Sequence, residues 1–250
     1  MIDGIIQYRA THSGFAEHDL DTFSKVAASL AWTRTLGVLR KAFGIDVNLE
    51  SVWEAHLTQK YATRDALATV KTMVEQKPYT NHVPTMTGGI GQQDLFVFYR
   101  DYFIPQHPPS MQLKLVSRTI GVDRVVDELV ISFKHTTSIP HILPGVPPTG
   151  KDVRIAAVSV VTIRGGKLFH EHMYWDQASV LVQVGLLDPK LVPGSMKQKG
   201  MKRLPVCGGE SASKVLDEES EPTNELIPGW ANRPRGDPGV QQPSQPKPAA

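Results

Sequence analysis

The chain has 250 residues, of which 40% are hydrophobic and 21% are charged, as is ordinary for a soluble globular protein with one good-sized core. Its 27 Lys and Arg residues exceed its 25 Asp and Glu residues by only two, so it lacks the broad basic surface typical of nucleic-acid-binding proteins. Cys207 is the only cysteine, which excludes an intrachain disulfide and a metal site made of several thiolates.

The amino-terminal segment shows no targeting pattern. Residues 1–14, MIDGIIQYRATHSG, have neither the basic start nor the continuous apolar core of a secretory signal. No apolar run in the sequence approaches the roughly 20 residues that span a bilayer. We therefore expect a cytoplasmic protein that binds neither membranes nor nucleic acid.

The first half of the chain has helical patterns. Apolar residues recur at helical spacing over residues 21–43, and Asp19 or Asp21 could cap that helix. Three further helices are predicted: one from an N-cap at Asn48 to about residue 61, one over residues 65–75, and one over residues 92–99 that stops before Pro105.

The second half changes to strand patterns. Residues 111–120, 124–135, 154–163 and 168–175 are rich in β-branched residues, and Gly165-Gly166 predicts a hairpin turn between the last two. A short helix capped by Asp176 follows and ends at Gly185. Helices first and strands second indicate the α+β class.

Composition divides the chain into three segments. Residues 1–46 are an N-terminal extension that is partly helical, and residues 47–204 are the main domain. Residues 205–250 form a C-terminal arm and a Pro-rich tail, whose last fifteen or so residues we expect to be disordered because they have almost nothing to bury.

The most specific sequence feature lies in the last predicted strand and the helix after it. Residues 166–177, GKLFHEHMYWDQ, are followed by LVQVG at 181–185. This stretch resembles the SnoaL-like, polyketide cyclase-like family of the nuclear transport factor 2-like (NTF2-like) superfamily, which includes limonene-type epoxide hydrolases. Residues 81–84 before Gly88-Gly89, and residues 125–136, resemble two further landmarks of the family. The resemblance covers about residues 49–188.

This resemblance implies a cone-shaped fold in which N-terminal helices pack on a curved, mostly antiparallel sheet and enclose a pocket for a small, mostly apolar molecule. The catalytic aspartate of these cyclases and hydrolases falls on Met173, which cannot transfer a proton. The assisting histidine of the cyclases falls on Ser159. The sequence therefore departs from the family at both positions of that pair.

Two glutamates are the candidates for proton transfer. Side chains alternate along a strand, so the family register places Glu171 on the pocket face, and it places Glu128 where the epoxide hydrolases carry a pocket arginine. Two carboxylates in one apolar cavity would have pKa values pushed apart, which could supply a general acid and a general base. The alternative is that Glu128 lies on the outer face, paired with Lys134 or Arg154, and that Glu171 only hydrogen-bonds within the sheet.

Other side chains have supporting roles in this hypothesis. His82 is either an assisting catalytic residue or a buried histidine satisfied by the backbone. The expected pocket wall and rim consist of Tyr99, Phe103, His135, Ser159, Met173 and Trp175. His170-Glu171-His172 looks like a metal motif, but the spacing alone is weak evidence, and we expect no metal and no cofactor.

The leading hypothesis is a cofactor-independent enzyme that uses acid–base chemistry on a small apolar metabolite, such as a polyketide or terpenoid intermediate undergoing isomerisation, ring closure or hydrolytic opening. The loss of the usual aspartate favours a rival, a non-catalytic small-molecule-binding or dimerisation module, because one fold serves many functions. An epoxide hydrolase with rearranged polar groups is a third possibility. By resemblance to the superfamily we also expect a homodimer formed through the outer face of the sheet.

Overall fold

The computed structural model describes residue 8 and residues 11–232. Its centre is one six-stranded sheet with the strand order β2-β1-β6-β5-β4-β3. All neighbouring strands are antiparallel except β1 and β6, which are parallel. The strands are β1 (Tyr79–His82), β2 (Thr87–Ile90), β3 (Gln112–Ile120), β4 (Arg124–Lys134), β5 (Asp152–Arg164) and β6 (Lys167–Trp175).

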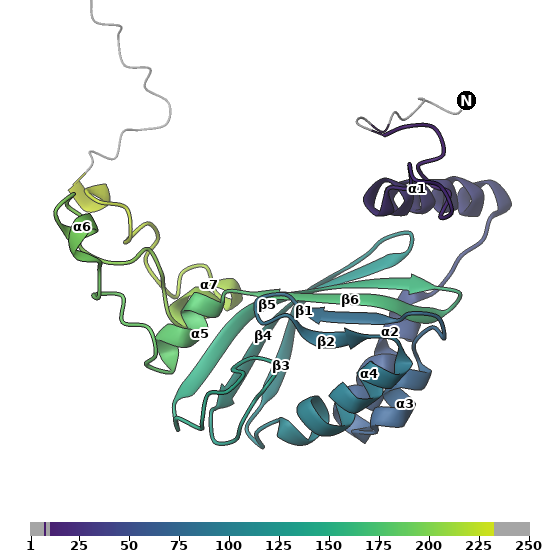
Figure 1. Ribbon diagram of the computed structural model, residues 1–250. Helices are drawn as coiled ribbons and strands as arrows, with labels where there is room; N and C mark the ends of the chain where they lie inside the picture. Colours follow the sequence, from purple (N-terminus) through teal and green to yellow (C-terminus); the bar gives the residue numbers. More distant parts are fainter. Residues whose placement is uncertain (1–7, 9–10, 233–250) are drawn as a thin grey trace, which may run out of the picture.

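Helices from the first half of the chain cover one face of the curved sheet (Figure 1). They are α2 (Leu49–Leu57), the π-helix η1 (Thr58–Thr63), α3 (Ala66–Lys71), α4 (Gln92–Val97), the π-helix η2 (Phe98–Phe103) and the short 3-10 helix η3 (Ile104–Gln106). The predicted α+β class, with N-terminal helices packed on a curved, mostly antiparallel sheet, is confirmed.

Local sequence explains where several helices begin. The side chain of Asn48 accepts a hydrogen bond from the backbone of Ser51 at 2.9 Å, and that of Asp65 accepts one from Ala68 at 2.9 Å, so both residues are N-caps. Asp176 is likewise the N-cap of α5 (Gln177–Gln183). The caps at Asn48 and Asp176 were predicted from the sequence.

Other helix boundaries differ from the prediction. Helix α1 (Lys25–Phe43) begins at Ser24, which accepts a hydrogen bond from Ala27, and not at Asp19 or Asp21. Helix α3 ends at Lys71, four residues before the predicted end. The segment after α4 continues through Pro105 as η3, because a proline can occupy the first turn of a helix.

The register of the sheet brings side chains from five strands into one row. Ser159 on β5 lies opposite both Met173 on β6 and Asp127 on β4. Met173 in turn lies beside His82 on β1, and Asp127 lies opposite Arg118 on β3. This row runs across the helix-covered face, and all of its members except His82 line the cavity described below.

Two apolar clusters form the core. One joins the helices to the centre of the sheet and includes Trp53, Leu95, Tyr99, Phe103, Val125, Val161 and Leu168. The other fills the opposite end of the same face and includes Leu129, Ile131, Phe133, Ile139, Leu143, Ile155 and Val180. Burial of these side chains is the main force that holds the helices on the sheet.

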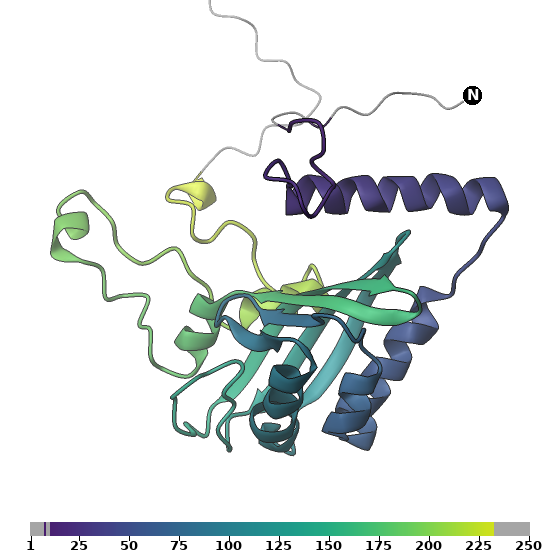
Figure 2. The same ribbon diagram turned by 45° about the vertical axis from the view of Figure 1, so that its right-hand side comes forward.

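Helix α1 and the C-terminal elements lie outside this layer. Helix α1 is on the opposite side of the sheet from α2, α3 and α4 in both views (Figures 1 and 2). It is attached near the β3–β4 turn, where Arg124 donates to Thr33 at 2.7 Å and Thr33 donates to Asp123 at 2.9 Å. The C-terminal elements are α5, α6 (Gly194–Lys197), α7 (Glu210–Leu216) and η4 (Trp230–Asn232).

Two further points concern the chain outside the sheet. Within the described residues, none of the helices combines the length and the apolar composition needed to cross a membrane. The Pro-rich tail predicted to be disordered lies at residues 233–250, outside the described residues.

A candidate active-site cavity with a buried ion pair

A cavity of about 450 Å³ lies between α2, η1 and the helix-covered face of the sheet. Its lining is mainly apolar and aromatic, with a few polar groups: Trp53, Glu54, Leu57, Thr58, Tyr61, Ala62, Leu113, Leu115, Arg118, Asp127, Leu129, Ser159, Glu171 and Met173. A cavity of this size, with mostly apolar walls and a small number of placed polar groups, is typical of a small-molecule site.

A buried ion pair forms part of the wall. Lys60 Nζ donates to both carboxylate oxygens of Glu171 at 2.9 Å. The two side chains are 1% and 3% exposed. The ammonium group also lies 4.7 Å from the centre of the Phe103 ring and 5.7 Å from that of Tyr99, where the ring faces attract a cation.

The chain positions this pair by local geometry. Glu171 is buried in β6 with Met173, whereas the residues between and around them are more exposed, as expected for alternating side chains. Lys60 follows Trp53 and His56 at intervals of seven and four residues, which places all three on the buried side of the α2–η1 helix. Lys60 lies in a π-helical turn, an irregularity often found at functional sites.

Stability alone does not explain the ion pair. Desolvating two charges costs several kcal/mol per ion, so a well-packed apolar pair of similar volume is often at least as stable. A buried carboxylate that faces a cavity and is paired with a single buried cation is instead typical of a group with a chemical role.

Near this pair, the histidines are held in the neutral form. Burial, and then the positive charge of Lys60, lower the pKa of His82 to about 3. The ring of His82 stacks on Phe103 at 5.6 Å between centres, and its Nδ1 lies 3.3 Å from the hydroxyl of Thr87. His82 is therefore a neutral side chain packed behind the cavity wall and is not among the residues that line the cavity.

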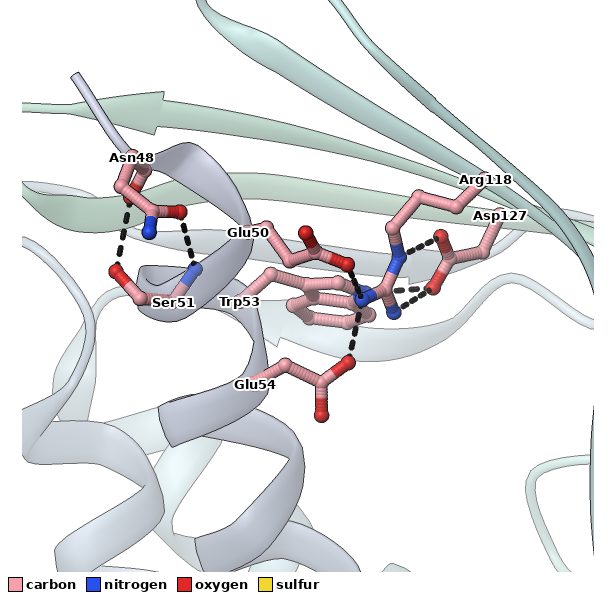
Figure 3. A network of polar contacts seen from close by, with 7 residues as sticks. All are labelled: Asn48, Glu50, Ser51, Trp53, Glu54, Arg118 and Asp127. Atoms are coloured by element: carbon pink, nitrogen blue, oxygen red, sulfur yellow. Dashed lines mark hydrogen bonds and ion pairs between the residues drawn. The ribbon is translucent and has the colours of Figure 1, made fainter. Parts of the chain in front are cut away.

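A second polar network, shown in Figure 3, includes the cavity-lining residues Trp53, Glu54, Arg118 and Asp127. Asp127 accepts two hydrogen bonds from Arg118, from Nε at 2.7 Å and from Nη2 at 2.8 Å, and one from Trp53 Nε1 at 2.7 Å. Arg118 also donates to Glu50 at 3.0 Å and to Glu54. The network connects α2 to the edge of the sheet and fixes one wall of the cavity.

The hydrogen bonds to Asp127, followed by those to Glu54 and Glu50, raise the pKa of Arg118. The guanidinium is therefore a permanent charge that three carboxylates surround. Such a saturated group holds structure in place and has few donors left for a ligand.

Of the two predicted glutamates, only Glu171 faces the cavity. The predicted position of Glu128 on the cavity face is wrong: its side chain lies on the outer face of β4, where Glu128 accepts a hydrogen bond from Ser117 at 3.0 Å. Asp127, one residue earlier, points inward. Neighbouring residues of a strand point to opposite faces, so the family register, aligned without gaps, assigns Glu128 to the wrong face of β4. The alternative prediction, that Glu128 lies on the outer face, is correct for the face, but Glu128 pairs with Ser117 and not with Lys134 or Arg154.

The other predicted site residues fall into three groups. Ser159 and Met173 lie opposite each other and line the main cavity. Trp175 and Phe103 line a narrow extension of about 10 Å³ beside it. Tyr99 and His135 are buried away from the cavity lining: Tyr99 lies 3.1 Å from the Thr80 hydroxyl, and His135 lies 3.1 Å from that of Thr149.

The sequence interpretation missed Lys60, Arg118 and Asp127. Two of them carried a recognisable signal, because Lys60 occupies the apolar side of a helix and Asp127 occupies the apolar side of a strand between Val125 and Leu129. A charge among apolar positions is rarely buried unless it has a partner. The partner of each lies far away in the sequence, so only the tertiary structure identifies it.

The two histidines of the apparent metal motif lie together on the outer side of β6. The ring centres of His170 and His172 are 5.5 Å and 5.3 Å from that of Tyr79. They therefore do not share a face with Glu171.

No protein-family model and no curated protein matches the chain. Among solved structures, the chain is similar to TsrD from Streptomyces laurentii, at 15% identity over 57% of this chain and 100% of that chain, with a TM-score of 0.45. It is similar to a putative SnoaL-like polyketide cyclase from Jannaschia sp. CCS1, at 16% identity over 58% of this chain and 99% of that chain, with a TM-score of 0.43. A third is an NTF2-like protein from Burkholderia thailandensis E264, at 15% identity over 54% of this chain and 95% of that chain, with a TM-score of 0.39.

Such low identities and TM-scores describe a likeness in arrangement and carry no information about chemistry. Two of these three structures bear the family names, SnoaL-like and NTF2-like, of the proteins that the sequence itself resembles.

Proposed function

We propose that this chain is a cofactor-independent enzyme that binds a small, mostly apolar molecule in the main cavity and transfers a proton with Glu171. The observation that carries the proposal is the buried Lys60–Glu171 pair, whose carboxylate faces the cavity. The substrate class is an apolar metabolite such as a polyketide or terpenoid intermediate, and the reaction is an isomerisation, a ring closure or a hydrolytic opening.

Glu171 is the proton acceptor in this proposal. Lys60 donates a hydrogen bond to each oxygen of Glu171 and so holds the carboxylate in one orientation. Each carboxylate oxygen retains a lone pair with which to accept a proton from a bound ligand. A carboxylate held in one orientation at the wall of a mainly apolar cavity can act as a general base toward a C–H bond of the bound ligand.

The step that fits this arrangement is removal of a proton from a carbon next to a carbonyl group. The proton moves to Glu171, and the electron pair of the broken C–H bond moves toward the carbonyl oxygen. The Ser159 hydroxyl, which is buried at the cavity wall without a hydrogen-bond partner among the described residues, is placed to donate to that oxygen. Return of the proton to another atom completes an isomerisation, and attack of the carbanion on a second carbonyl closes a ring.

A binding protein without chemistry is the second candidate. It is favoured by Met173, which stands where the related enzymes carry a catalytic aspartate and which lines both the main cavity and its narrow extension. A binding protein would hold the same apolar ligands but leave them unchanged.

We also propose that two copies associate through the outer face of the sheet. Val158 and Tyr174 are neighbours on that face, and they are 36% and 45% exposed. Apolar side chains exposed side by side on a sheet face are typical of an interface.

The enzyme proposal is tested with 5-nitrobenzisoxazole, a generic probe for a base in an apolar site. Removal of its ring C–H proton breaks the N–O bond and releases the coloured 2-cyano-4-nitrophenolate. We expect the wild type to accelerate this reaction and Glu171→Gln to lose about 100-fold or more, the contribution typical of one general base.

Glu128→Gln is the matched control, because it makes the same change on the outer face of the sheet. It is expected to keep the wild-type rate. Equal rates in the wild type and in Glu171→Gln, with the probe bound by both, would refute the enzyme and leave the binding protein.

A further inference from the structure

The narrow extension has a polar lining that the proposed chemistry does not use. It has a volume of about 10 Å³ and is lined in part by His107, His141 and Trp175. It shares Tyr61 and Met173 with the main cavity, so the two spaces adjoin. This volume accommodates about one oxygen atom of the size of water.

One ring nitrogen of His141 is buried without a partner. His141 is 4% exposed, and its Nδ1 has no hydrogen-bond partner within the described residues. In the neutral tautomer that carries its proton on Nε2, Nδ1 is a hydrogen-bond acceptor.

His107 presents a second free nitrogen close by. The centres of the His107 and His141 rings are 5.3 Å apart, and His107 Nε2 is buried without a protein partner in the described part of the chain. Burial, and then Lys60 and Arg64, lower the pKa of His107 to about 4, while burial lowers the pKa of His141 well below its usual value. Both rings are therefore neutral at neutral pH.

The groups that face these two histidines leave few alternatives for what they bind. Tyr61 stacks on His107 with ring centres 5.5 Å apart, and Phe103 contacts His141 at 4.4 Å. Aromatic rings on these sides disfavour a hydrated ion, and two neutral nitrogens offer hydrogen bonds without a countercharge. A hydroxyl group fits these two side chains, because it can donate its proton to the acceptor nitrogen of His141 and form a second hydrogen bond with the unpaired nitrogen of His107.

We propose that this narrow end binds a hydroxyl group of the ligand, which donates to Nδ1 of His141 and pairs with Nε2 of His107. The ligand class is thereby narrowed to apolar molecules, ring-shaped in the simplest case, that carry an alcohol or a phenol at one end while a carbon atom faces Glu171. The inference rests on the proposed function in one respect, namely that the ligand occupies the main cavity.

Two probes that differ by one oxygen test the inference. Binding of 2-naphthol and of naphthalene is measured by titration calorimetry with the full chain. The wild type is expected to bind 2-naphthol about tenfold more tightly, the ratio typical of one buried hydrogen bond. His141→Phe is expected to bind both probes with equal affinity.

His107→Phe provides a second variant at a half-buried position, and circular dichroism checks that each variant is folded. His172→Phe is the matched control, since it replaces a histidine on the outer side of β6, away from the cavity, and it is expected to keep the preference for 2-naphthol. Glu171→Gln is also expected to keep the preference for 2-naphthol, so hydroxyl binding is tested separately from proton transfer.

Three results would overturn the inference. The wild type could bind 2-naphthol and naphthalene equally well, or the preference for 2-naphthol could survive in both His141→Phe and His107→Phe. The third result is a preference for 2-naphthol that is lost in Ser159→Ala instead of in the histidine variants. Failure of both probes to bind would refute the use of the main cavity, and with it the proposed function. Absence of proton transfer in the wild type, with its hydroxyl preference intact, would refute the proposed function alone.

Discussion

Lys60 and Glu171 are 111 residues apart in the sequence, yet the ammonium nitrogen lies 2.9 Å from both carboxylate oxygens. The pair joins the helical layer to the centre of the sheet and is shielded from solvent by aromatic rings. Its geometry makes Glu171 an oriented carboxylate at a cavity wall, and it has consequences for stability that can be measured separately from activity.

Removing one partner of this pair leaves a buried charge without compensation. We expect Lys60→Met and Glu171→Leu each to lower the free energy of unfolding by about 3–5 kcal/mol, and the double variant to lower it by much less than the sum, because the double change removes both charges. Urea unfolding of the four proteins measures the coupling. Single variants as stable as the wild type would show that the pair is not buried in solution.

Stability is expected to depend on pH through His82. The pKa of His82 is lowered to about 3 in the folded chain, whereas the unfolded value is about 6.5. The unfolded chain therefore binds more protons between these values, and this contribution to stability is present above pH 6.5 and is lost as the pH falls toward 3.

His82→Phe removes this pH-dependent contribution. Between pH 7 and pH 5, the free energy of unfolding should therefore fall by about 2 kcal/mol less in the variant than in the wild type. The same substitution at His12, which is exposed, serves as the control. Unfolding curves at the two pH values supply the comparison, and parallel losses in wild type and His82→Phe would contradict the buried neutral state.

The network around Asp127 yields a test of the cavity wall. Trp53→Phe keeps the aromatic bulk but removes the donor that lies 2.7 Å from Asp127, and we expect it to lower the free energy of unfolding by about 1–2 kcal/mol. Trp32→Phe makes the same change at a tryptophan that is 50% exposed and should have little effect. If both variants were equally stable, the bond to Asp127 would contribute nothing.

The proposed dimer is tested on the outer face. Tyr174→Asp places a charge beside Val158 on the exposed outer face, where desolvating it would oppose association. Light scattering after size-exclusion chromatography should give a dimer for the wild type and a monomer for this variant. A stable wild-type monomer would refute the dimer.

Much of the fold was predictable because its determinants are local. The N-caps Asn48 and Asp176 and the Gly165-Gly166 turn act over a few residues, and the regular alternation of β6 determined which side chains share a face with Glu171. Ser159 and Met173, the two positions at which the sequence departs from the family pair, lie opposite each other on neighbouring strands.

The site was less predictable because its partners meet only through tertiary packing. No local pattern relates Lys60 to Glu171 or Trp53 to Asp127. On β4 the family alignment placed Glu128 on the cavity face, whereas the structure places Asp127 there and Glu128 on the outer face. The catalytic roles assigned to Glu171 and His82, the division of the chain at residues 46 and 204, and the dimer remain predictions.

Proton removal by Glu171 is tested most directly by deuterium incorporation into 2-indanone, an apolar bicyclic ketone, followed by NMR in D₂O. The account predicts that the wild type and Glu128→Gln exchange the protons beside the carbonyl about 100-fold or more faster than Glu171→Gln, as one positioned general base provides. Exchange by Glu171→Gln at the wild-type rate would contradict it.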